Sequence, residues 1–439
     1  MAFLRFIGRW TMTALLLNCI IGGGVFGVPG ELNRMLGRAS PLAMLFAALG
    51  MAVIILCVAE VASQFSDSGG PYLYVRSAFG RFMGMQVGWF HLLTVVATVA
   101  GLANLFVDYL SRFLPLHGHI WTRDLIMATL IAVPAAANYR GVRTGAKLSN
   151  VTTVAKLAPL ALLIVAGIVR FAQQPQVIHA SEIASPGLSN WMRAMVFLLF
   201  TYGGWEDGLI PTGEVCETRR TIPFALGTAL VACTGIYMLL QFVTVATIGA
   251  KVTDAPLAEV ASILLGRSGA SFVAIAAMVS VYGWISADLL NAPRLVYSLA
   301  ASGDFPSVFK KVHPRFYTPA YAIFFYAITA WLLAISGGFL WAAAIAASSM
   351  IVYYAATCAS LARLRKLRPN PEALRIPAGP LLSILGVVIS LALMTGLKQR
   401  ELLLMSVTAL IATINWLWAR QRRGLTETRA TLAGPHPRP

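Results

Sequence analysis

Two glycine-rich stretches decide the fold of this chain: Ile20–Gly30 reads IIGGGVFGVPG, and Thr201–Gly208 reads TYGGWEDG, with Pro211 shortly after it. Each stretch interrupts a long apolar run. A glycine inside a helix costs about 1 kcal/mol relative to alanine, and unwound backbone at membrane depth is tolerated only where it faces protein or a water-filled cavity. Gly203 follows Gly23 by 180 residues. The pattern therefore predicts two broken membrane helices at corresponding places in two halves of the chain.

The broken ends also predict a ligand. At Gly22 to Val25, free N–H groups at the start of a half-helix suit a carboxylate. Carbonyl groups of Cys19 to Ile21 and of Phe200 to Tyr202 suit an ammonium group, so the two breaks together predict a site for an α-amino acid. The alternative is that the glycines only let helices pack closely, as small residues do in membranes. Two matched motifs, each followed by a proline, favour the binding site.

The composition excludes an ordinary soluble enzyme. The 439 residues are 58% hydrophobic and 12% charged, whereas soluble domains carry about 25% charged residues. The formal net charge of +17 comes from 34 Lys and Arg against 17 Asp and Glu, and most of these bases lie in short clusters between apolar runs. This distribution indicates membrane topology rather than binding to nucleic acid. The five cysteines have no CxxC spacing, so neither a zinc site nor a disulfide framework is expected.

Apolar runs of about 20 residues, bounded by charges and turn residues, predict twelve membrane-spanning helices. They cover approximately residues 10–36, 41–64, 82–111, 121–137, 148–170, 190–217, 224–249, 269–298, 318–335, 339–361, 378–397 and 401–420. With a cytoplasmic N-terminus, 23 of the 34 Lys and Arg fall on the cytoplasmic side, ten fall outside, and Lys156 remains within a span. This excess places both termini in the cytoplasm of a multi-pass protein of the plasma (inner) membrane.

The chain is expected to form a single transmembrane domain over residues 1–420. Within it, residues 10–170 make the first repeat, residues 190–361 make the second, and residues 378–420 make two extra helices. The amphipathic stretch Asp254–Gly266 is too short to cross the membrane, so we expect a helix that lies over the outer face. Residues 421–439 are expected to be a disordered cytoplasmic tail because of their Pro and Arg content.

Four motifs show that the chain resembles the amino acid–polyamine–organocation superfamily and, within it, the L-amino acid transporter branch. They are IIGGGVFGVPG, SGGPYLYVRSAFG at Ser68–Gly80, TYGGWED followed by GEVCETRRTIP, and NAPRLVYSLAASGDFP at Asn291–Pro306. The resemblance implies an all-α membrane protein with a LeuT-like fold, in which a five-plus-five inverted repeat carries two extra helices and spans one and six are broken. It implies an outer gate formed by Trp205 or Tyr202. The implied substrate-binding residues are Ile21, Gly22, Gly23, Gly24, Val25, Tyr202, Gly203, Trp205 and Glu206.

The sequence departs from the family pattern in two places. Members often have a serine between the first-span glycines that helps to hold the substrate carboxylate, whereas this chain has Gly23 and offers only backbone donors. Eukaryotic relatives attach to a heavy chain by a disulfide from the loop between spans three and four. The corresponding loop, Arg112–Thr122, contains no cysteine. We therefore expect a stand-alone prokaryotic-type permease without a disulfide-linked heavy chain.

Lys156 lies about nine residues into the fifth span, too deep to reach either interface comfortably. A charge at mid-helix costs at least about 2.5–3.5 kcal/mol. In sodium-coupled relatives of the implied fold, a sodium ion lies at this place between spans one, five and eight, so the resemblance implies that the ammonium group replaces the ion. Ser280 on the eighth span is the hydroxyl expected to accept its hydrogen bond, along with carbonyl groups of the first span. The alternative is a lysine bound to carbonyl groups for structural reasons alone.

Glu206 directly follows the second break. In part of the family a carboxylate at this place carries or senses protons, so Glu206 is expected to take part in coupling; alternatively, it only binds loose backbone N–H groups. Asp207 is expected at the start of the next half-helix, where negative charge is favourable. Asp288 is expected either in the substrate cavity or against the inner vestibule.

These observations predict a secondary active transporter of neutral L-amino acids that works by proton symport or exchange and does not need sodium. The alternatives are a cationic amino acid or polyamine antiporter, or a sensor that binds an amino acid without transporting it. The histidines, His91 among them, are not spaced as metal ligands or beside a nucleophile, and no nucleotide-binding or catalytic-triad pattern is present. We expect no enzyme activity, no metal and no cofactor; the expected partners are the amino acid and membrane lipid.

Overall fold

The computed structural model describes residues 7–65, 70–116, 118–141, 146–174, 186–209, 215–249, 251, 253–367 and 374–432. Every regular element among these residues is a helix. The α-helices are α1 (Arg9–Ile20), α2 (Gly24–Gly27), α3 (Pro29–Leu36), α4 (Ser40–Ala62), α5 (Gly70–Phe79), α6 (Arg81–Leu110), α7 (Ile120–Tyr139), α8 (Ala146–Gln173), α9 (Leu188–Tyr202), α10 (Trp205–Gly208), α11 (Thr218–Ile248), α12 (Pro256–Ala301), α13 (Ala320–Ile335), α14 (Phe339–Leu367), α15 (Gly379–Met394) and α16 (Gln399–Leu432).

The helices are those of a membrane protein. Within the described ranges, eight helical stretches are long and apolar enough to cross a membrane. The outer face of the bundle is also apolar: Leu381, Ile384, Val388 and Leu391 are each more than half exposed, and their spacing places them on one side of α15. A continuous apolar stripe of this kind is unfavourable in water. The chain is therefore a multi-pass membrane protein.

Both predicted helix breaks are present. α1 ends at Ile20, and the chain becomes helical again at Gly24, where α2 begins. Val28, between α2 and α3, keeps helical backbone angles (φ −80°, ψ −30°), so these two short helices continue one another. The second break lies between Tyr202, the last residue of α9, and Trp205, the first of α10.

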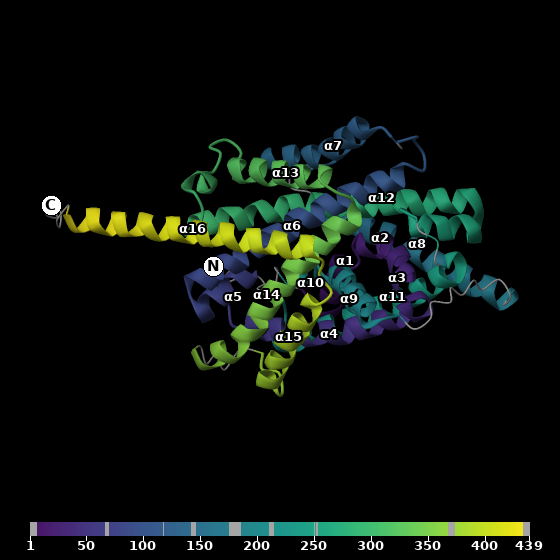
Figure 1. Ribbon diagram of the computed structural model, residues 1–439, viewed down its shortest axis with the longest axis horizontal. Coiled ribbons are helices and arrows are strands. Elements are labelled where there is room, and N and C mark those ends of the chain that lie inside the picture. Colours follow the sequence, from purple (N-terminus) through teal and green to yellow (C-terminus); the bar gives the residue numbers. More distant parts are fainter. Residues whose placement is uncertain are drawn as a thin grey trace.

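α6 and α14 form the centre of the bundle and pack against each other. α6 also packs against α12, α13 and α16, and α14 packs against α4, α9 and α15. In Figure 1, α7 and α13 lie along the upper edge, α4 and α15 lie along the lower edge, and α1, α2, α9 and α10 lie between them. The two breaks are therefore held inside the bundle.

Two of the quoted motifs meet at one end of the bundle. Asp304, from the motif at the end of α12, is fully buried. It accepts hydrogen bonds from Tyr72 and Arg81, and Arg76 forms an ion pair with it at 3.4 Å. Asn415 of α16 donates a hydrogen bond to the Asp304 carbonyl at 2.7 Å. This cluster joins α5, α6, α12 and α16.

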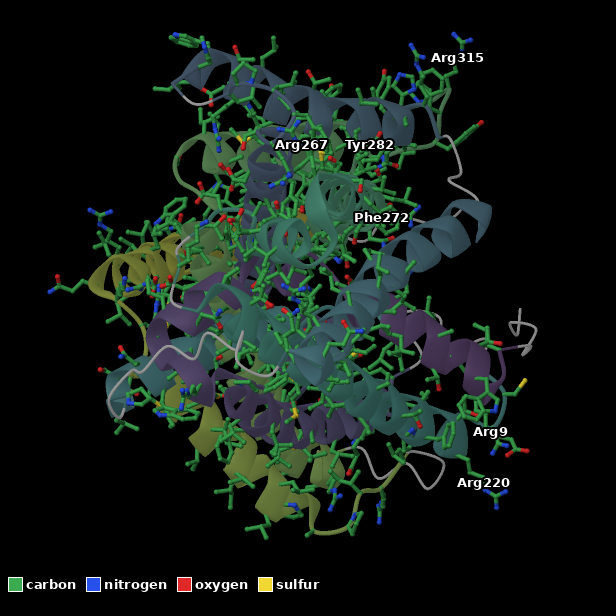
Figure 2. All side chains as sticks on the ribbon, turned by 90° about the vertical axis from the view of Figure 1, so that its right-hand side faces the viewer. Arg9, Arg220, Arg267, Phe272, Tyr282 and Arg315 are labelled. Atoms are coloured by element: carbon green, nitrogen blue, oxygen red, sulfur yellow. The ribbon has the colours of Figure 1, made fainter. Side chains whose placement is uncertain are left out.

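Three basic residues lie at the rim of the bundle. Arg9, Arg220 and Arg315 extend outward from the helices (Figure 2). The starts of α1 and α11 are neighbours, since the Arg9 guanidinium lies 5.3 Å from the centroid of the Phe224 ring. An isolated bridge between Ile7 and Val215 also joins these segments.

The structure adds one helix and corrects one expectation. α5 is a short helix that the prediction of spans did not include. The expected amphipathic segment is the start of α12, which bends at Gly266 (φ 74°) before it enters the long apolar span. The tail was expected to be disordered from residue 421, but α16 continues to Leu432, because the prolines that indicated disorder begin only at Pro435. Residues 433–439, like Pro211, lie outside the described residues.

Candidate functional site

The two helix breaks contact each other directly. A Cβ atom at Gly24 would lie 2.8 Å from the Cα atom of Thr201, and one at Gly204 would lie 2.7 Å from the carbonyl oxygen of Cys19. Gly204 also has φ +92°, a conformation that residues with a side chain rarely adopt. Glycine is therefore required at both positions, and the close approach joins two segments that are far apart in the sequence.

Tyr237 of α11 connects the same two breaks. Its buried hydroxyl group donates to the carbonyl oxygen of Ile20 at 3.1 Å and lies 3.4 Å from that of Thr201. These carbonyls belong to the ends of α1 and α9, where helices leave carbonyl groups without helical partners. Sequence reasoning missed Tyr237 because it lies in an apolar span and in none of the motifs.

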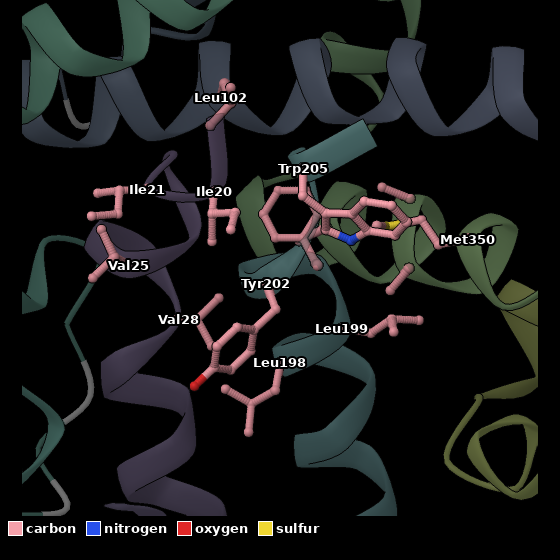
Figure 3. Packing of buried hydrophobic residues seen from close by; sticks show 14 of the residues in the cluster. Ile20, Ile21, Val25, Val28, Leu102, Leu198, Leu199, Tyr202, Trp205 and Met350 are labelled. Carbon is pink, nitrogen blue, oxygen red and sulfur yellow. The ribbon is translucent and has the colours of Figure 1, made fainter. Parts of the chain in front are cut away.

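A cavity lies beside the two breaks. Figure 3 shows Leu102 projecting from α6 toward the first break, and Met350 of α14 beside Trp205 at the second. α6, α12 and α14 supply the rest of the wall. The lining residues are Cys19, Ile20, Gly22, Gly23, Gly24, His91, Thr94, Val95, Thr98, Leu102, Phe200, Thr201, Gly203, Gly204, Glu206, Asp207, Trp284, Met350 and Tyr353.

The surroundings of the cavity differ between the side near Gly27 and the side near α1. Phe339, the first residue of α14, packs edge-on against Phe200 with ring centroids 6.0 Å apart. Its ring also fills the space beside Gly27, where a Cβ atom would lie 2.2 Å away. At the other end, Asp207 is exposed and Cys19 is partly exposed. The lining of the cavity is therefore more exposed beside α1 and α10, which pack against each other, than beside Phe339.

The start of α2 supplies backbone donors. The Gly22 N–H is already bonded to the carbonyl of Ile20 at 2.8 Å. The N–H groups of Gly23, Gly24 and Val25 find no backbone acceptor within the described part of the chain. Of the predicted binding residues, Ile21 and Val25 place their side chains in the hydrophobic core, so only their backbone groups can serve the site.

The opposite end of the cavity is negative. The carbonyl groups of Asn18 and Ile20 already accept hydrogen bonds from Lys156 and Tyr237. Cys19 and the exposed carboxylate of Asp207 line the opening. Backbone donors at one end and a carboxylate at the other suit a zwitterion.

Glu206 is held firmly in the cavity wall. Its carboxylate accepts hydrogen bonds from the N–H of Gly204 at 2.9 Å, from the hydroxyl of Tyr353 at 3.0 Å and from the hydroxyl of Tyr354. The carboxylate thus satisfies loose backbone at the break, which was the alternative role considered from the sequence. The two tyrosines that hold it come from α14 and could not be paired with it from the sequence.

The two residues expected to form the gate lie behind the cavity wall. Trp205 is 0% exposed, and its ring stacks on Tyr354 with centroids 5.9 Å apart. Tyr202 is equally buried, and its hydroxyl donates to the carbonyl oxygen of Met44 at 3.0 Å. Neither lines the cavity. Phe200, by contrast, lines the cavity and packs against Phe339.

Lys156 connects α8 to the first break. It is 4% exposed, and its ammonium group donates to the carbonyl oxygen of Asn18 in α1 at 3.1 Å. The expected hydrogen bond to Ser280 is absent in this conformation: the Ser280 hydroxyl is buried and has no hydrogen-bond partner among the described residues. Of the two kinds of acceptor that were expected, the α1 carbonyl accepts the hydrogen bond of Lys156 and the α12 hydroxyl does not.

Asp288 is not part of the cavity wall. Its carboxylate is buried between α12 and α13 and accepts a hydrogen bond from the hydroxyl of Tyr326. Of the three carboxylates Glu206, Asp207 and Asp288, only the first two therefore border the cavity, and Glu206 already accepts hydrogen bonds from two tyrosine hydroxyls.

Three polar residues of α6 were missed by the sequence reasoning: His91, Thr94 and Thr98 all line the cavity. Their spacing of three and four residues places them on one face of the helix. That polar stripe in an otherwise apolar span was the signal that could have found them.

Comparison with known proteins agrees with this architecture. The family model described as amino acid permease matches residues 7–413. The serine/threonine exchanger SteT of Bacillus subtilis (strain 168) is 26% identical over 398 residues, which cover 87% of this chain and 88% of the relative. The large neutral amino acids transporter small subunit 2 of Oryctolagus cuniculus is 26% identical over 388 residues, covering 84% and 72%. The cationic amino acid transporter 4 of Mus musculus is 25% identical over 350 residues, covering 75% and 55%.

The family match includes both helix breaks, the α6 wall of the cavity and the cluster around Asp304. The relatives are transporters and not enzymes. This chain therefore belongs to the amino acid permease family of the amino acid–polyamine–organocation superfamily.

Proposed function

We propose that this chain is a secondary active transporter of neutral L-amino acids in the plasma (inner) membrane. The observation that carries the proposal is the contact of two helix breaks beside a cavity with free N–H groups at one end and a carboxylate at the other. The substrate carboxylate binds the N–H groups of Gly23, Gly24 and Val25, at the positive end of the helix formed by α2 and α3. The substrate ammonium group lies toward Cys19 and Asp207.

The proposed architecture has twelve spans in one domain of residues 1–420. α1 to α3 form the broken first span, and α9 with α10 begins the broken sixth. A LeuT-like five-plus-five inverted repeat relates residues 10–170 to residues 190–361, and α15 and α16 are the two extra helices. The matched positions of the breaks support this assignment, because paired interruptions in two halves mark the central site of such transporters.

The proposed orientation places both termini in the cytoplasm, as the distribution of Lys and Arg favours. The open end of the cavity, at Asp207, then faces the cytoplasm, and the conformation is inward-facing. Phe200 and Phe339 form the closed outer gate. Trp205 and Tyr202 flank the second break and act on the gate from there. Trp205 holds the break against α14, and Tyr202 holds it against α4.

Coupling is proposed to involve protons or exchange and not sodium. The ammonium group of Lys156 lies beside the first break. There it donates a hydrogen bond to the helix-end carbonyl that a bound cation would otherwise contact. Ser280 is its proposed partner in another conformation of the cycle, since its hydroxyl is buried in α12 and ready to accept a hydrogen bond. Glu206 is the proposed proton-sensitive group, because a change in its charge would alter its bonds to Gly204 and to both tyrosines.

A second candidate, transport of cationic amino acids or polyamines, has one specific observation in its favour. Asp207 is an exposed carboxylate at the cavity opening, and one relative is named as a cationic amino acid transporter. A non-transporting sensor is separated from both candidates by the absence of uptake. We propose that the chain works without a disulfide-linked heavy chain, since the loop between spans three and four contains no cysteine.

Two experiments test the proposal. In proteoliposomes, radiolabelled neutral amino acids should be taken up without a sodium gradient; uptake that requires sodium contradicts the assignment of Lys156, and uptake of lysine or polyamines alone favours the second candidate. In detergent, alkylation of the cavity residue Cys19 should slow when a neutral amino acid is bound. Cys216, which is partly exposed and does not line the cavity, serves as the control. If none of the twenty amino acids slows the alkylation of Cys19, the result contradicts a substrate site at the breaks.

A further inference from the structure

One wall of the cavity is a polar face on α6. His91, Thr94 and Thr98, which we call the α6 polar face, all line the cavity and lie on one side of the helix. Polar side chains inside a membrane bundle are costly unless they find partners. Three of them directed at one cavity indicate that a polar part of the ligand binds there.

The threonine hydroxyls of this face are already committed as donors. Thr98 Oγ1 donates to the carbonyl oxygen of Thr94 at 2.8 Å, and Thr94 Oγ1 donates to that of Phe90 at 3.0 Å. A hydroxyl group has one hydrogen and two lone pairs, so both threonines can only accept a hydrogen bond from a ligand. His91 Nδ1 is buried and finds no hydrogen-bond partner in the described residues. The two threonines of the α6 polar face therefore fit a ligand group that donates a hydrogen bond, and His91 Nδ1 accepts one as well when the ring is protonated at Nε2.

The face suits a neutral donor better than a cation. The lining residues of α6 include no acidic side chain. Glu206 is occupied by two tyrosine hydroxyls and a backbone N–H, and Asp207 lies at the Cys19 end, where the α-ammonium group is placed. A side-chain ammonium at the α6 polar face would lose its hydration without gaining a counter-charge, which costs far more than burying a hydroxyl group.

Two apolar side chains of the cavity lining pack against the breaks. A Cβ atom at Gly23 would lie 2.0 Å from Leu102 Cδ2, and one at Gly203 would lie 2.3 Å from Met350 Cε. Leu102 and Met350 therefore form an apolar part of the wall, and the α6 polar face is a separate, polar part of it.

We propose that the α6 polar face binds the side-chain hydroxyl of the substrate, so that the transporter selects serine and threonine over alanine and valine. The inference rests on the proposed function, since the breaks must hold the α-carboxylate and α-ammonium groups. Thr98 and His91 are specificity-determining residues of that site.

The test compares ligands that differ by one hydroxyl group. Binding of threonine against valine, and of serine against alanine, is measured by calorimetry on purified protein in detergent. Wild type should prefer the hydroxylated member of each pair by about fivefold or more, the factor for one net hydrogen bond. Thr98→Val, which keeps the shape but removes the hydroxyl, and His91→Leu should each reduce the preference about fivefold. Valine binding should remain in Thr98→Val, which shows that this variant is folded.

Thr244→Val is the matched control. Thr244 of α11 is fully buried and makes the same kind of hydrogen bond, to the carbonyl oxygen of Leu240 at 2.8 Å, but it does not line the cavity. This variant should keep the wild-type preference. Equal affinity of wild type for threonine and valine overturns the inference, as does an unchanged preference in both cavity variants. Those results differ from failure of the proposed function, in which wild type binds no amino acid at all.

Discussion

Replacing Gly204 by alanine perturbs the contact between the two helix breaks. The residue has φ +92°, and holding a residue with a side chain in such a region costs about 1–3 kcal/mol. The new Cβ atom would also lie 2.7 Å from the carbonyl oxygen of Cys19, which is backbone and cannot rotate away. We expect the two effects together to lower the free energy of unfolding by about 2–4 kcal/mol and to push α1 away from the second break.

The assay is unfolding of the purified protein in detergent, followed by tryptophan fluorescence, together with calorimetric amino acid binding. Gly235→Ala is the control, because Gly235 lies within α11 with no atom near the position of its Cβ, and alanine favours a helix. Gly204→Ala should unfold at clearly lower temperature and bind substrate weakly, whereas Gly235→Ala should match or exceed wild type. If Gly204→Ala keeps wild-type stability and affinity, the close approach of the breaks does not govern the site.

Further predictions concern five residues, three around the site and two in the motif cluster. Tyr237→Phe should weaken substrate binding by about fivefold, because the hydroxyl that joins Ile20 to α9 is lost; unchanged affinity in calorimetry would sink this role. Lys156→Ala should slow uptake in proteoliposomes while amino acid binding in detergent survives. Glu206→Gln should flatten the dependence of uptake on pH between about pH 5 and 8; if the pH profile is instead lost only in Lys156→Ala, the proton-sensitive role belongs to the lysine. Asp304→Asn should lower the free energy of unfolding by about 2–3 kcal/mol, because two arginines lose their buried partner. Burial, with the neighbouring Asp304, raises the pKa of Tyr72 from 10.0 to about 12. The contribution of the neutral Tyr72 hydroxyl to stability is therefore full below pH 10 and is lost as the pH rises toward 12. Denaturation at pH 8, 10 and 12 measures this loss.

The sequence by itself determined the two breaks and the all-helical membrane character of the chain, because both depend on local properties of the chain. Glycine clusters weaken a helix wherever it lies, so Gly22 to Gly24 and Gly203 with Gly204 marked the interruptions correctly. Long apolar runs must cross the membrane as helices because lipid offers no hydrogen bonds to the backbone. The same local logic indicated an amino acid, since exposed helix ends carry opposite partial charges.

Only the tertiary structure decided which side chains surround the site. The face that a membrane helix turns toward a cavity depends on how neighbours distant in sequence pack against it, and an apolar span does not reveal that face. Trp205 follows the second break and Tyr202 precedes it, as expected. Trp205 is nevertheless buried against α14 and Tyr202 against α4. His91, dismissed for its spacing, enters the cavity wall because α6 crosses the first break. Tyr237 and the two tyrosines that hold Glu206 come from other helices, and their hydrogen bonds exist only once the bundle has assembled.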